Sequence, residues 1–389
     1  MELTPADVLG LRMTSLLLRP GATPHPGAQP HPGARPDARP DDVTGVVTWF
    51  GAMQSQDLAS GMWSLGCRLP GRTWDDVHAA LERREALRTW PMRSTVHLVP
   101  PRDARWMLDL MGPRVLAGAA ARRATLGLDE ATANRAVDVL AAALAGGGRL
   151  TRSQCVAALA EAGIEPAGQR GYHLLWYASQ LGVTCVAPNI GKEQTFVLLD
   201  EWVPDPHRPE RDEALGIMAV RYFRSHGPTT RQDFAGWTGL TAADAKRGIE
   251  VAGDELVSVR VDGREMFASP ALLDAYDPGA AGSYGDEVLV LPGFDEYLLG
   301  FKDRSLMVAE EHKQAIIPGG NGVFQSTVVR DGRVVGTWKR TTGRRETTID
   351  VRPLVPLGAG DRVRVAAAFE PYGHFVGQPL RIRWSDAAG

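Results

Sequence analysis

The sequence is poor in cysteine: its 389 residues include only Cys67, Cys155 and Cys185. These three lie far apart and form no CxxC pair, so neither a disulfide framework nor a zinc site built on cysteines is expected. Long apolar runs are also missing, and a membrane-spanning helix needs about 18 or more consecutive apolar residues. The first residues, Met1-Glu2-Leu3, lack the basic region of a secretory signal. We therefore expect a cytoplasmic protein with no membrane partner.

Conventional catalytic motifs are missing as well. The chain has no GxSxG, no Walker A loop, no HExxH and no GxGxxG after a predicted strand. His25 and His31 lie in a stretch rich in proline and glycine, from Pro20 to Pro40. Two histidines without further ligands make a poor metal site. We therefore predict a protein that holds no metal and no cofactor.

Lysine is scarce, at five residues, so nearly all the positive charge comes from arginine. The formal net charge of −3 argues against a surface that is basic all over. The charges are nevertheless segregated along the chain. Basic residues outnumber acidic ones by nine to three over 83–123 and by seven to three over 330–352, whereas acidic residues dominate 200–213 and 286–311. This pattern suits a basic groove along a phosphate backbone, or a bipolar surface that has no partner.

The apolar content of 44% supports several domains with cores of their own, and the patterning predicts an α+β fold that is mainly helical. Thr4 and Pro5 mark the start of a first helix. Further helices are predicted over 43–53, 74–84, 101–111, 130–144, 151–162, 169–181, 215–226, 230–237 and 242–251. Strands are predicted over 88–99 (a hairpin), 183–187, 195–199, 256–261, 265–268, 288–291, 323–329, 333–339, 363–369 and 380–384.

One order of elements, helices followed by a pair of strands, occurs twice in the chain. In its second occurrence Asp262-Gly263 predicts a tight hairpin turn between the strands. Three helices and a two-stranded wing are the order of a winged helix, and generic α+β packing is the alternative. The expected domains are a first winged-helix region over 1–149 with an insertion at 19–42, winged helices over 150–200 and 201–285, and a β-rich module over 286–389.

The most distinctive polar segment is Gln54-Ser55-Gln56, which follows an apolar helix. On a helix these two glutamines would point in different directions, whereas in an extended segment residues two apart face the same way. If the helix ends near Met53, two neutral amides face one side and can hold a water in a fixed orientation. Amides are weak bases, so the pair suits a reaction whose leaving group is already activated. The alternative is a pair of solvated or helix-capping glutamines.

Several blocks of the sequence, taken in order, resemble the tandem winged-helix DNA glycosylases of the AlkZ/YcaQ family. The blocks are Gln54-Ser55-Gln56, residues 88–98 (RTWPMRSTVHL), residues 291–300 (LPGFDEYLLG), residues 321–324 (NGVF) and residues 336–340 (GTWKR). The resemblance covers nearly the whole chain apart from the proline-rich insertion. It implies three winged helices in a C-shaped arrangement.

The resemblance also implies an enzyme that excises bulky N7-alkylated purines and acts on interstrand crosslinks left by natural-product alkylators. The family's catalytic pair of glutamines maps onto Gln54 and Gln56, while a sister branch has an acid at the second position. Ser55 stands where the family usually has an apolar residue. The implied partner is double-stranded DNA containing alkylated or crosslinked purines, so the protein would be associated with the nucleoid when bound.

Further polar residues are candidates for contact with DNA. Arg93 and His97 share a face if 92–98 is a strand, although His97 is also consistent with a buried packing role. The other candidates are basic residues of the C-terminal module, for which a solvated loop is the alternative: Lys339, Arg340, Arg344 and Arg345. Asp295 and Glu296 resemble a catalytic pair in composition, but adjacent residues alternate faces on a strand, so a structural role is expected. Asp57 is a further candidate for an electrostatic partner or a base, but in an extended segment its side chain would point to the face opposite the glutamines.

A different class of function is also compatible with winged helices, namely a non-enzymatic transcriptional regulator. Such a regulator normally dimerises and reads a palindrome. A chain with two or three winged helices needs no dimer to surround a duplex. The length of the chain therefore favours a glycosylase that acts as a monomer.

Overall fold

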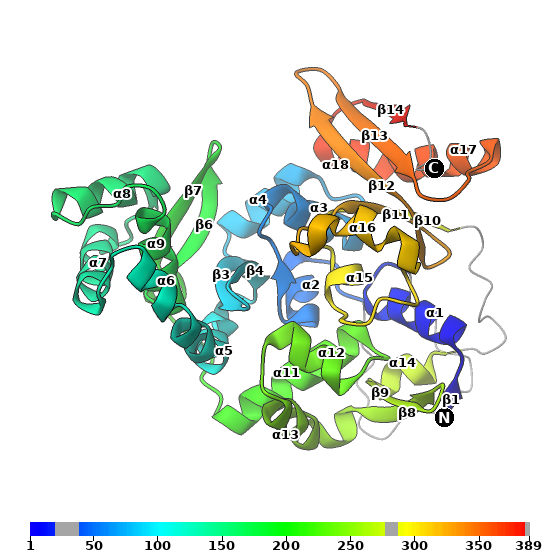
Figure 1. Ribbon diagram of the computed structural model, residues 1–389, viewed down its shortest axis with the longest axis horizontal. Helices are drawn as coiled ribbons and strands as arrows, with labels where there is room; N and C mark the ends of the chain where they lie inside the picture. The colour runs from blue at the N-terminus through cyan, green and yellow to red at the C-terminus, as the bar shows by residue number, and fades with distance from the viewer. Residues whose placement is uncertain (20–38, 277–286, 386–389) are drawn as a thin grey trace. The chain divides into compact units, whose positions relative to one another are not determined.

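The computed structural model describes residues 1–19, 39–276 and 287–385, so His25 and His31 lie outside the described residues. The chain divides into two compact units (Figure 1). The first comprises Met1–Val77, Leu215–Trp237 and Thr241–Gly389, and the second comprises His78–Ala214 and Thr238–Leu240. The four-part division along the chain stays a prediction. None of the helices formed by the described residues is long and apolar enough to cross a membrane.

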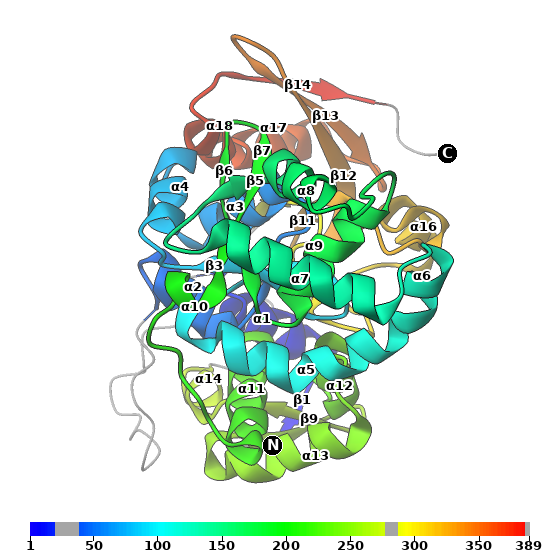
Figure 2. The same ribbon diagram turned by 90° about the vertical axis from the view of Figure 1, so that its left-hand side faces the viewer.

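The second unit contains the winged-helix order predicted for 150–200, preceded by a helix that completes it. Thr151 and Gln154 form a capping box that starts the second helix, because each side chain bonds the other's backbone N–H. Figure 2 shows α7 toward the viewer with the wing strands behind it. The elements are α7 (Glu130–Leu144), β5 (Leu150–Thr151), α8 (Arg152–Glu161), α9 (Arg170–Gln180), β6 (Thr184–Ile190) and β7 (Glu193–Leu198), followed by α10 (Leu199–Trp202).

The order predicted for 201–285 is confirmed too. Asp262 and Gly263 have φ values of 48° and 76°, so they form the tight hairpin turn that the sequence predicts. The first residues of the chain join this wing, because β1 (Glu2–Leu3) pairs in parallel with β8. The elements are α11 (Arg211–His226), α12 (Arg231–Thr238), α13 (Ala242–Ala252), η2 (Gly253–Glu255), β8 (Val257–Val261), β9 (Arg264–Ala268) and α14 (Pro270–Asp274), with α1 (Pro5–Ser15) near the N-terminus.

The same order occurs once more near the start of the described chain. In its wing, Pro91 lies where the pairing of β3 with β4 shifts register, which is a position a strand proline can occupy. In the second unit the strand order is β4-β3-β6-β7-β5. The elements are α2 (Val43–Phe50), β2 (Met53–Gln54), α3 (Leu58–Arg68), α4 (Trp74–Glu82), β3 (Leu87–Met92) and β4 (Thr95–Val99), followed by η1 (Pro101–Asp103), α5 (Ala104–Gly118) and α6 (Ala120–Thr125).

The C-terminal part forms a sheet with strand order β10-β11-β12-β13-β14, so the fold is α+β with winged-helix units and a β-rich module, as predicted. Neighbouring strands are antiparallel except β13 and β14, which run in parallel. The elements are β10 (Val288–Leu291), α15 (Glu296–Leu299), η3 (Glu310–His312), α16 (Lys313–Ile316), η4 (Pro318–Gly320), β11 (Ser326–Arg330), β12 (Arg333–Thr342), β13 (Thr347–Pro353), α17 (Ala359–Ala368), α18 (Glu370–Val376) and β14 (Leu380–Trp384).

Two predictions in this module are wrong. The strand predicted over 363–369 is occupied by helix α17, whose N-cap is Gly358 and whose Asp361 side chain accepts from the Gly358 N–H. Its alternating valine and arginine residues resemble a strand, but the following alanines favour a helix. Asp295 and Glu296 do not lie on a strand either. Asp295 is the N-cap of α15 and Glu296 is its first residue, so a turn, not strand alternation, directs these two carboxylates.

Candidate active site and nucleic-acid interface

Gln54-Ser55-Gln56 forms the non-helical link between α2 and α3. Helix α2 ends at Phe50 and is closed by Gly51, which has a φ of 79°. The helix therefore stops three residues before the predicted position. Gln54 lies in the extended element β2 and is only 6% exposed. Gln56 follows at a bend and is exposed. The segment thus leaves the helix, as predicted, and joins a buried residue to an exposed one, whereas the expectation that both amides face one side stays a prediction.

The buried carboxylate of Glu296 holds the main chain of this segment. The Gln54 backbone N–H donates to Glu296 Oε1 at 3.0 Å. The other carboxylate oxygen, Oε2, accepts from Trp237 Nε1 at 2.9 Å and lies 3.4 Å from His226 Nε2. Glu296 is fully buried, so it cannot touch a substrate, but it sets the position of the Gln54 backbone. We describe it as a positioning residue.

The neighbouring acid, Asp295, neutralises a buried arginine of helix α3. Arg68 donates from Nη1 to Asp295 Oδ2 at 2.9 Å and from Nη2 to Oδ1 at 3.1 Å, a bidentate pair. Ser64 Oγ adds a bond to Oδ2 at 2.7 Å. Burial would lower the pKa of Arg68, but the Asp295 carboxylate outweighs it and raises that pKa above its ordinary value. Asp295 therefore has the structural role that the sequence predicts for it.

Ser55 packs against helix α3 at Gly61. A Cβ at Gly61 would lie 2.6 Å from Ser55 Oγ and 3.2 Å from Ser55 Cα. Ser55 is buried, so it lies in the protein interior and is not part of the exposed surface. The absence of a side chain at Gly61 on the facing helix therefore leaves room for the buried Ser55.

Asp57 acts as the N-cap of α3. Its carboxylate accepts from the Ser60 backbone N–H at 3.0 Å and from Ser60 Oγ at 2.6 Å. Arg340 of β12 forms an ion pair with the same carboxylate, at 3.3 Å. These contacts give Asp57 a structural role, and they bring one of the predicted DNA-binding arginines to within one residue of Gln56.

The remaining basic candidates of the first unit lie on the β12–β13 hairpin. Lys339 is exposed on β12, and Arg344 and Arg345 are exposed in the turn between the two strands. Arg340 is partly buried because of its ion pair with Asp57. The hairpin thus presents cations to solvent, which is the property that contact with a phosphate backbone needs.

The structure treats the two candidates of the β3–β4 hairpin differently. Arg93 is partly exposed in the turn, whereas His97 is fully buried. His97 Nδ1 lies 2.8 Å from the Thr95 carbonyl oxygen, and its Nε2 lies 3.4 Å from Arg93 Nη2. Because His97 is buried, the packing role is favoured over direct contact with DNA. Its ring lies beneath Arg93 and helps to orient that side chain. Arg93 remains the candidate for DNA contact.

Metal-binding clusters and buried cysteine thiols are two further kinds of group to consider. Histidine, cysteine, aspartate and glutamate residues form no cluster of three that could hold a metal ion within the described parts of the chain. Burial raises the pKa of the Cys155 thiol to about 12 and raises that of Cys185 further. These two cysteines are therefore protonated at neutral pH and are poor nucleophiles.

Comparison with known proteins assigns the chain to a family. Residues 47–375 match the sequence model described as "DNA glycosylase AlkZ-like". The chain belongs to the AlkZ-like DNA glycosylase family. It is 31% identical over 280 residues to the curated "Interstrand DNA cross-link repair glycosylase" of Streptomyces sahachiroi, covering 68% of this chain and 73% of that protein. The solved structure "Streptomyces sahachiroi DNA glycosylase AlkZ" superposes with a TM-score of 0.75 at 25% identity, over 98% of this chain and 100% of that one.

Membership of the AlkZ-like family decides between the two classes of function. The protein is a DNA N-glycosylase with a role in DNA repair, and its substrate is DNA. The second winged helix is itself unsuited to a regulator's usual way of reading bases. The third helix of a winged helix normally enters the major groove, but in α9 nearly every residue from Gly171 to Gln180 is buried.

Sequence reasoning missed the role of Glu296, and it did not identify Arg68 as a partner of Asp295. The block Phe294-Asp295-Glu296-Tyr297 was recognised, but the residues that these acids contact lie more than 50 positions away. A signal was present for Arg68, because it is a lone charge in the otherwise uncharged helix Leu58–Arg68. Such a residue, when buried, requires an acidic partner.

Replacing Glu296 by glutamine is expected to slow excision by about tenfold while leaving the protein folded. The two donors bond different carboxylate oxygens, and glutamine replaces one of these oxygens by an NH2 group, so either the Gln54 N–H or Trp237 Nε1 faces another donor and loses its bond. Single-turnover rates of base excision measure the effect, and circular dichroism checks the fold. The double variant Trp237→Phe/Glu296→Gln removes the competing donor and should recover part of the loss. An unchanged rate in Glu296→Gln would show that this bond does not position Gln54.

Proposed function

We propose that this AlkZ-like DNA glycosylase excises bulky N7-alkylated purines from double-stranded DNA and unhooks interstrand crosslinks formed through such purines. It acts as a monomer, with Gln54 and Gln56 as the catalytic pair. The observation that carries this proposal is the non-helical Gln54-Ser55-Gln56 link, in which Gln54 lies in β2 and its backbone is held by buried Glu296. The similarity to a glycosylase named for interstrand cross-link repair supports the choice of substrate.

The chemistry follows from the charge of the substrate. An N7-alkylated guanine carries a positive charge, so the bond between its N9 and the sugar C1′ is already weakened. That bond breaks with its electron pair moving onto the purine, and a water oxygen forms the new bond to C1′ and releases a proton. The two glutamine amides hold this water in position but do not act as strong bases. The reaction therefore needs orientation more than proton transfer.

The DNA contacts are proposed to come from basic side chains on two hairpins. Lys339, Arg344 and Arg345 are exposed on β12–β13, and Arg93 is partly exposed in the β3–β4 turn. Phosphate contacts of this kind fix the register of a protein on the duplex without reading its sequence. They also release counterions, so affinity for duplex DNA is expected to fall steeply as the salt concentration rises.

The direct test is an excision assay on two substrates. The protein is incubated with a duplex carrying one N7-methylguanine and with a duplex carrying one crosslink from a bifunctional N7-alkylating agent. Alkali then converts each abasic site into a strand break. Breaks at the position of the N7-methylguanine support purine excision, and conversion of the crosslinked species to separable strands supports unhooking. Absence of breaks on both substrates, with duplex binding intact, would exclude the proposed substrate class.

A further inference from the structure

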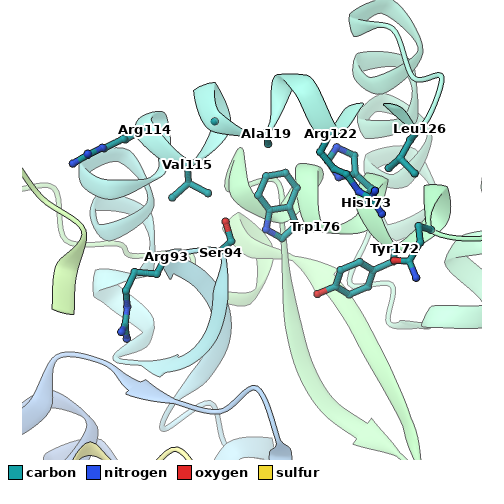
Figure 3. Close-up of a pocket in the computed structure, with 12 residues that line it drawn as sticks. Arg93, Ser94, Arg114, Val115, Ala119, Arg122, Leu126, Tyr172, His173 and Trp176 are labelled. Atoms are coloured by element: carbon teal, nitrogen blue, oxygen red, sulfur yellow. The ribbon is translucent and has the colours of Figure 1, made fainter. Parts of the chain in front are cut away.

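The second unit contains a cavity of about 540 Å³ that the proposed catalytic pair does not use. Its walls come from the end of α5, from α6, from the first half of α9 and from the β3–β4 turn (Figure 3). This volume lies within the range of roughly 300–1,000 Å³ that is typical of pockets for small organic ligands. The cavity is therefore large enough for a group with the size of a nucleotide.

The cavity is positively charged. Arg93, Arg114 and Arg122 line it, and the described lining residues include no aspartate or glutamate. In Figure 3, Arg93 and Arg114 lie on one side of Trp176 and Arg122 lies on the other. Arg114 donates from Nη1 to the Gly239 carbonyl oxygen at 3.1 Å, which fixes the side chain and leaves its other guanidinium donors for a ligand. Guanidinium groups on two sides suit a ligand with more than one anionic group.

The turn that carries Arg93 has an unusual backbone. Arg93 and Ser94 are the two central residues of the β3–β4 hairpin, between the paired residues Met92 and Thr95. Their φ values are 53° and 59°, the left-handed region in which such turns normally use asparagine and glycine. Both residues line the cavity, and backbone conformations of this kind cluster at active sites and ligand-binding sites.

Aromatic side chains form the other walls. The rings of His173 and Trp176 pack against each other with centroids 5.1 Å apart. The Arg152 guanidinium lies over the Tyr172 ring at 5.4 Å, and Tyr172 itself is partly exposed. Figure 3 shows the Tyr172 side chain reaching into the space beneath Trp176. A nucleobase stacks well on such surfaces, and base–aromatic stacking is tolerant of base identity.

A buried polar atom in the cavity wall lacks a partner. His173 is only 7% exposed, and its Nε2 has no hydrogen-bond partner among the described residues. Burial, together with the charges of Arg123 and Arg122, lowers the pKa of His173, so the ring is neutral at physiological pH. A buried ring nitrogen without a partner is costly unless a ligand supplies one. The cavity is thus equipped for a ligand that carries both phosphate and hydrogen-bonding groups.

We propose that this cavity binds one unpaired nucleotide of a DNA strand. Arg93 and Arg114 contact one flanking phosphate and Arg122 contacts the next, while the base stacks on Tyr172 beside the edge of Trp176. His173 Nε2 bonds to the base or the sugar. The inference rests on the proposed function only in taking DNA as the ligand. It names a place where a nucleotide displaced from a distorted or unhooked duplex is held.

Photocrosslinking tests which residues the nucleotide touches. The full-length chain is irradiated with a duplex that contains one unpaired 5-iododeoxyuridine, and the attached peptides are identified by mass spectrometry. Attachment at Tyr172 or Trp176 is expected. Attachment confined to residues outside the cavity would overturn the proposal. Because this experiment needs no excision, its outcome is independent of whether N7-alkylated purines are the substrate.

Affinity measurements test the charge and the aromatic wall separately. Tyr172→Ala is expected to weaken binding of the duplex with one unpaired nucleotide by about tenfold, with little change for a fully paired duplex of the same length. Arg122→Ala should weaken the same complex and reduce the slope of log K against log salt by roughly 0.7, the value for one phosphate of a single strand. The matched control is Arg208→Ala, which removes an exposed arginine elsewhere in the same unit.

Two outcomes would contradict this assignment. Equal losses of affinity in Arg122→Ala and Arg208→Ala, for both duplexes, would show only that a positive charge was removed. A deoxynucleoside 5′-monophosphate that competes as strongly as the unpaired strand would show a site for a free nucleotide. The proposal of a strand-bound nucleotide is supported if Arg208→Ala still binds the duplex with one unpaired nucleotide more tightly than the fully paired duplex, and Tyr172→Ala does not.

Discussion

A Gln54→Ala variant is expected to excise N7-methylguanine about 5- to 1,000-fold more slowly than the unaltered protein. This range corresponds to about 1–4 kcal/mol of barrier, the scale of losing one preorganised hydrogen-bonding group. The effect should appear in the single-turnover rate, because the amide is proposed to orient water during bond breaking. Gln54 is buried, and Glu296 holds its backbone N–H. Neighbouring residues therefore have little freedom to move and take over the role of the missing amide.

The control for this variant is Gln232→Ala, which removes the same amide from an exposed position on α12. Its excision rate should match that of the unaltered protein. Gln56→Ala should lose activity like Gln54→Ala, whereas Gln56→Glu keeps a group that can hold water and should keep part of the activity. Full activity in both alanine variants would remove the two glutamines from the mechanism while leaving the glycosylase assignment intact.

An Asp295→Ala variant is expected to lower the free energy of unfolding by about 3–5 kcal/mol. Arg68 and Asp295 are both buried, and the substitution leaves the guanidinium without its only bidentate partner among the described residues. The desolvation of Arg68 is then no longer compensated by an opposite charge. Urea unfolding followed by tryptophan fluorescence measures the change, provided that the transition is two-state.

Two controls separate the loss of a partner from the loss of a salt bridge. Glu346→Ala breaks the largely exposed pair between Glu346 and Arg381, and it should cost no more than about 1 kcal/mol. The double variant Arg68→Met/Asp295→Leu replaces both charges by apolar groups and should be far less damaging than Asp295→Ala. Equal destabilisation in the single and double variants would mean that the carboxylate stabilises the protein in some way other than by neutralising Arg68.

The adjacent acids Asp295 and Glu296 have separate tasks. Asp295 neutralises Arg68 and thereby keeps helix α3 in place, and Glu296 holds the Gln54 backbone. The glutamine pair is proposed to perform the chemistry, yet it is positioned by residues that lie more than 200 positions further along the chain. Both Glu296→Gln and Asp295→Ala are therefore expected to affect excision, but only Asp295→Ala, which leaves a buried guanidinium without its bidentate partner, should strongly affect stability.

Local signals in the sequence were sufficient for much of the architecture. Thr151 with Gln154, and Asp262 with Gly263, predict a helix start and a hairpin turn from interactions within four residues, and both are present. The order of helices and wings follows from these signals because each element is set mainly by its own pattern. The break in the helix before Gln54 was predictable in the same way, although its position differed by three residues.

Tertiary structure alone decided the features that depend on distant residues. Three such features are the burial of His97, the pairing of β1 with β8 and the bond from the Gln54 N–H to Glu296. Each depends on residues that are distant in the chain, which local sequence patterns do not encode. The alternation of valine and arginine before Phe369 led to the wrong prediction of a strand. Over only a few residues, the alternating pattern of a strand cannot be distinguished from the pattern of a short helix. The sequence by itself determined most of the elements and placed the glutamine motif after a helix, whereas packing determined which amide is buried and what holds it there.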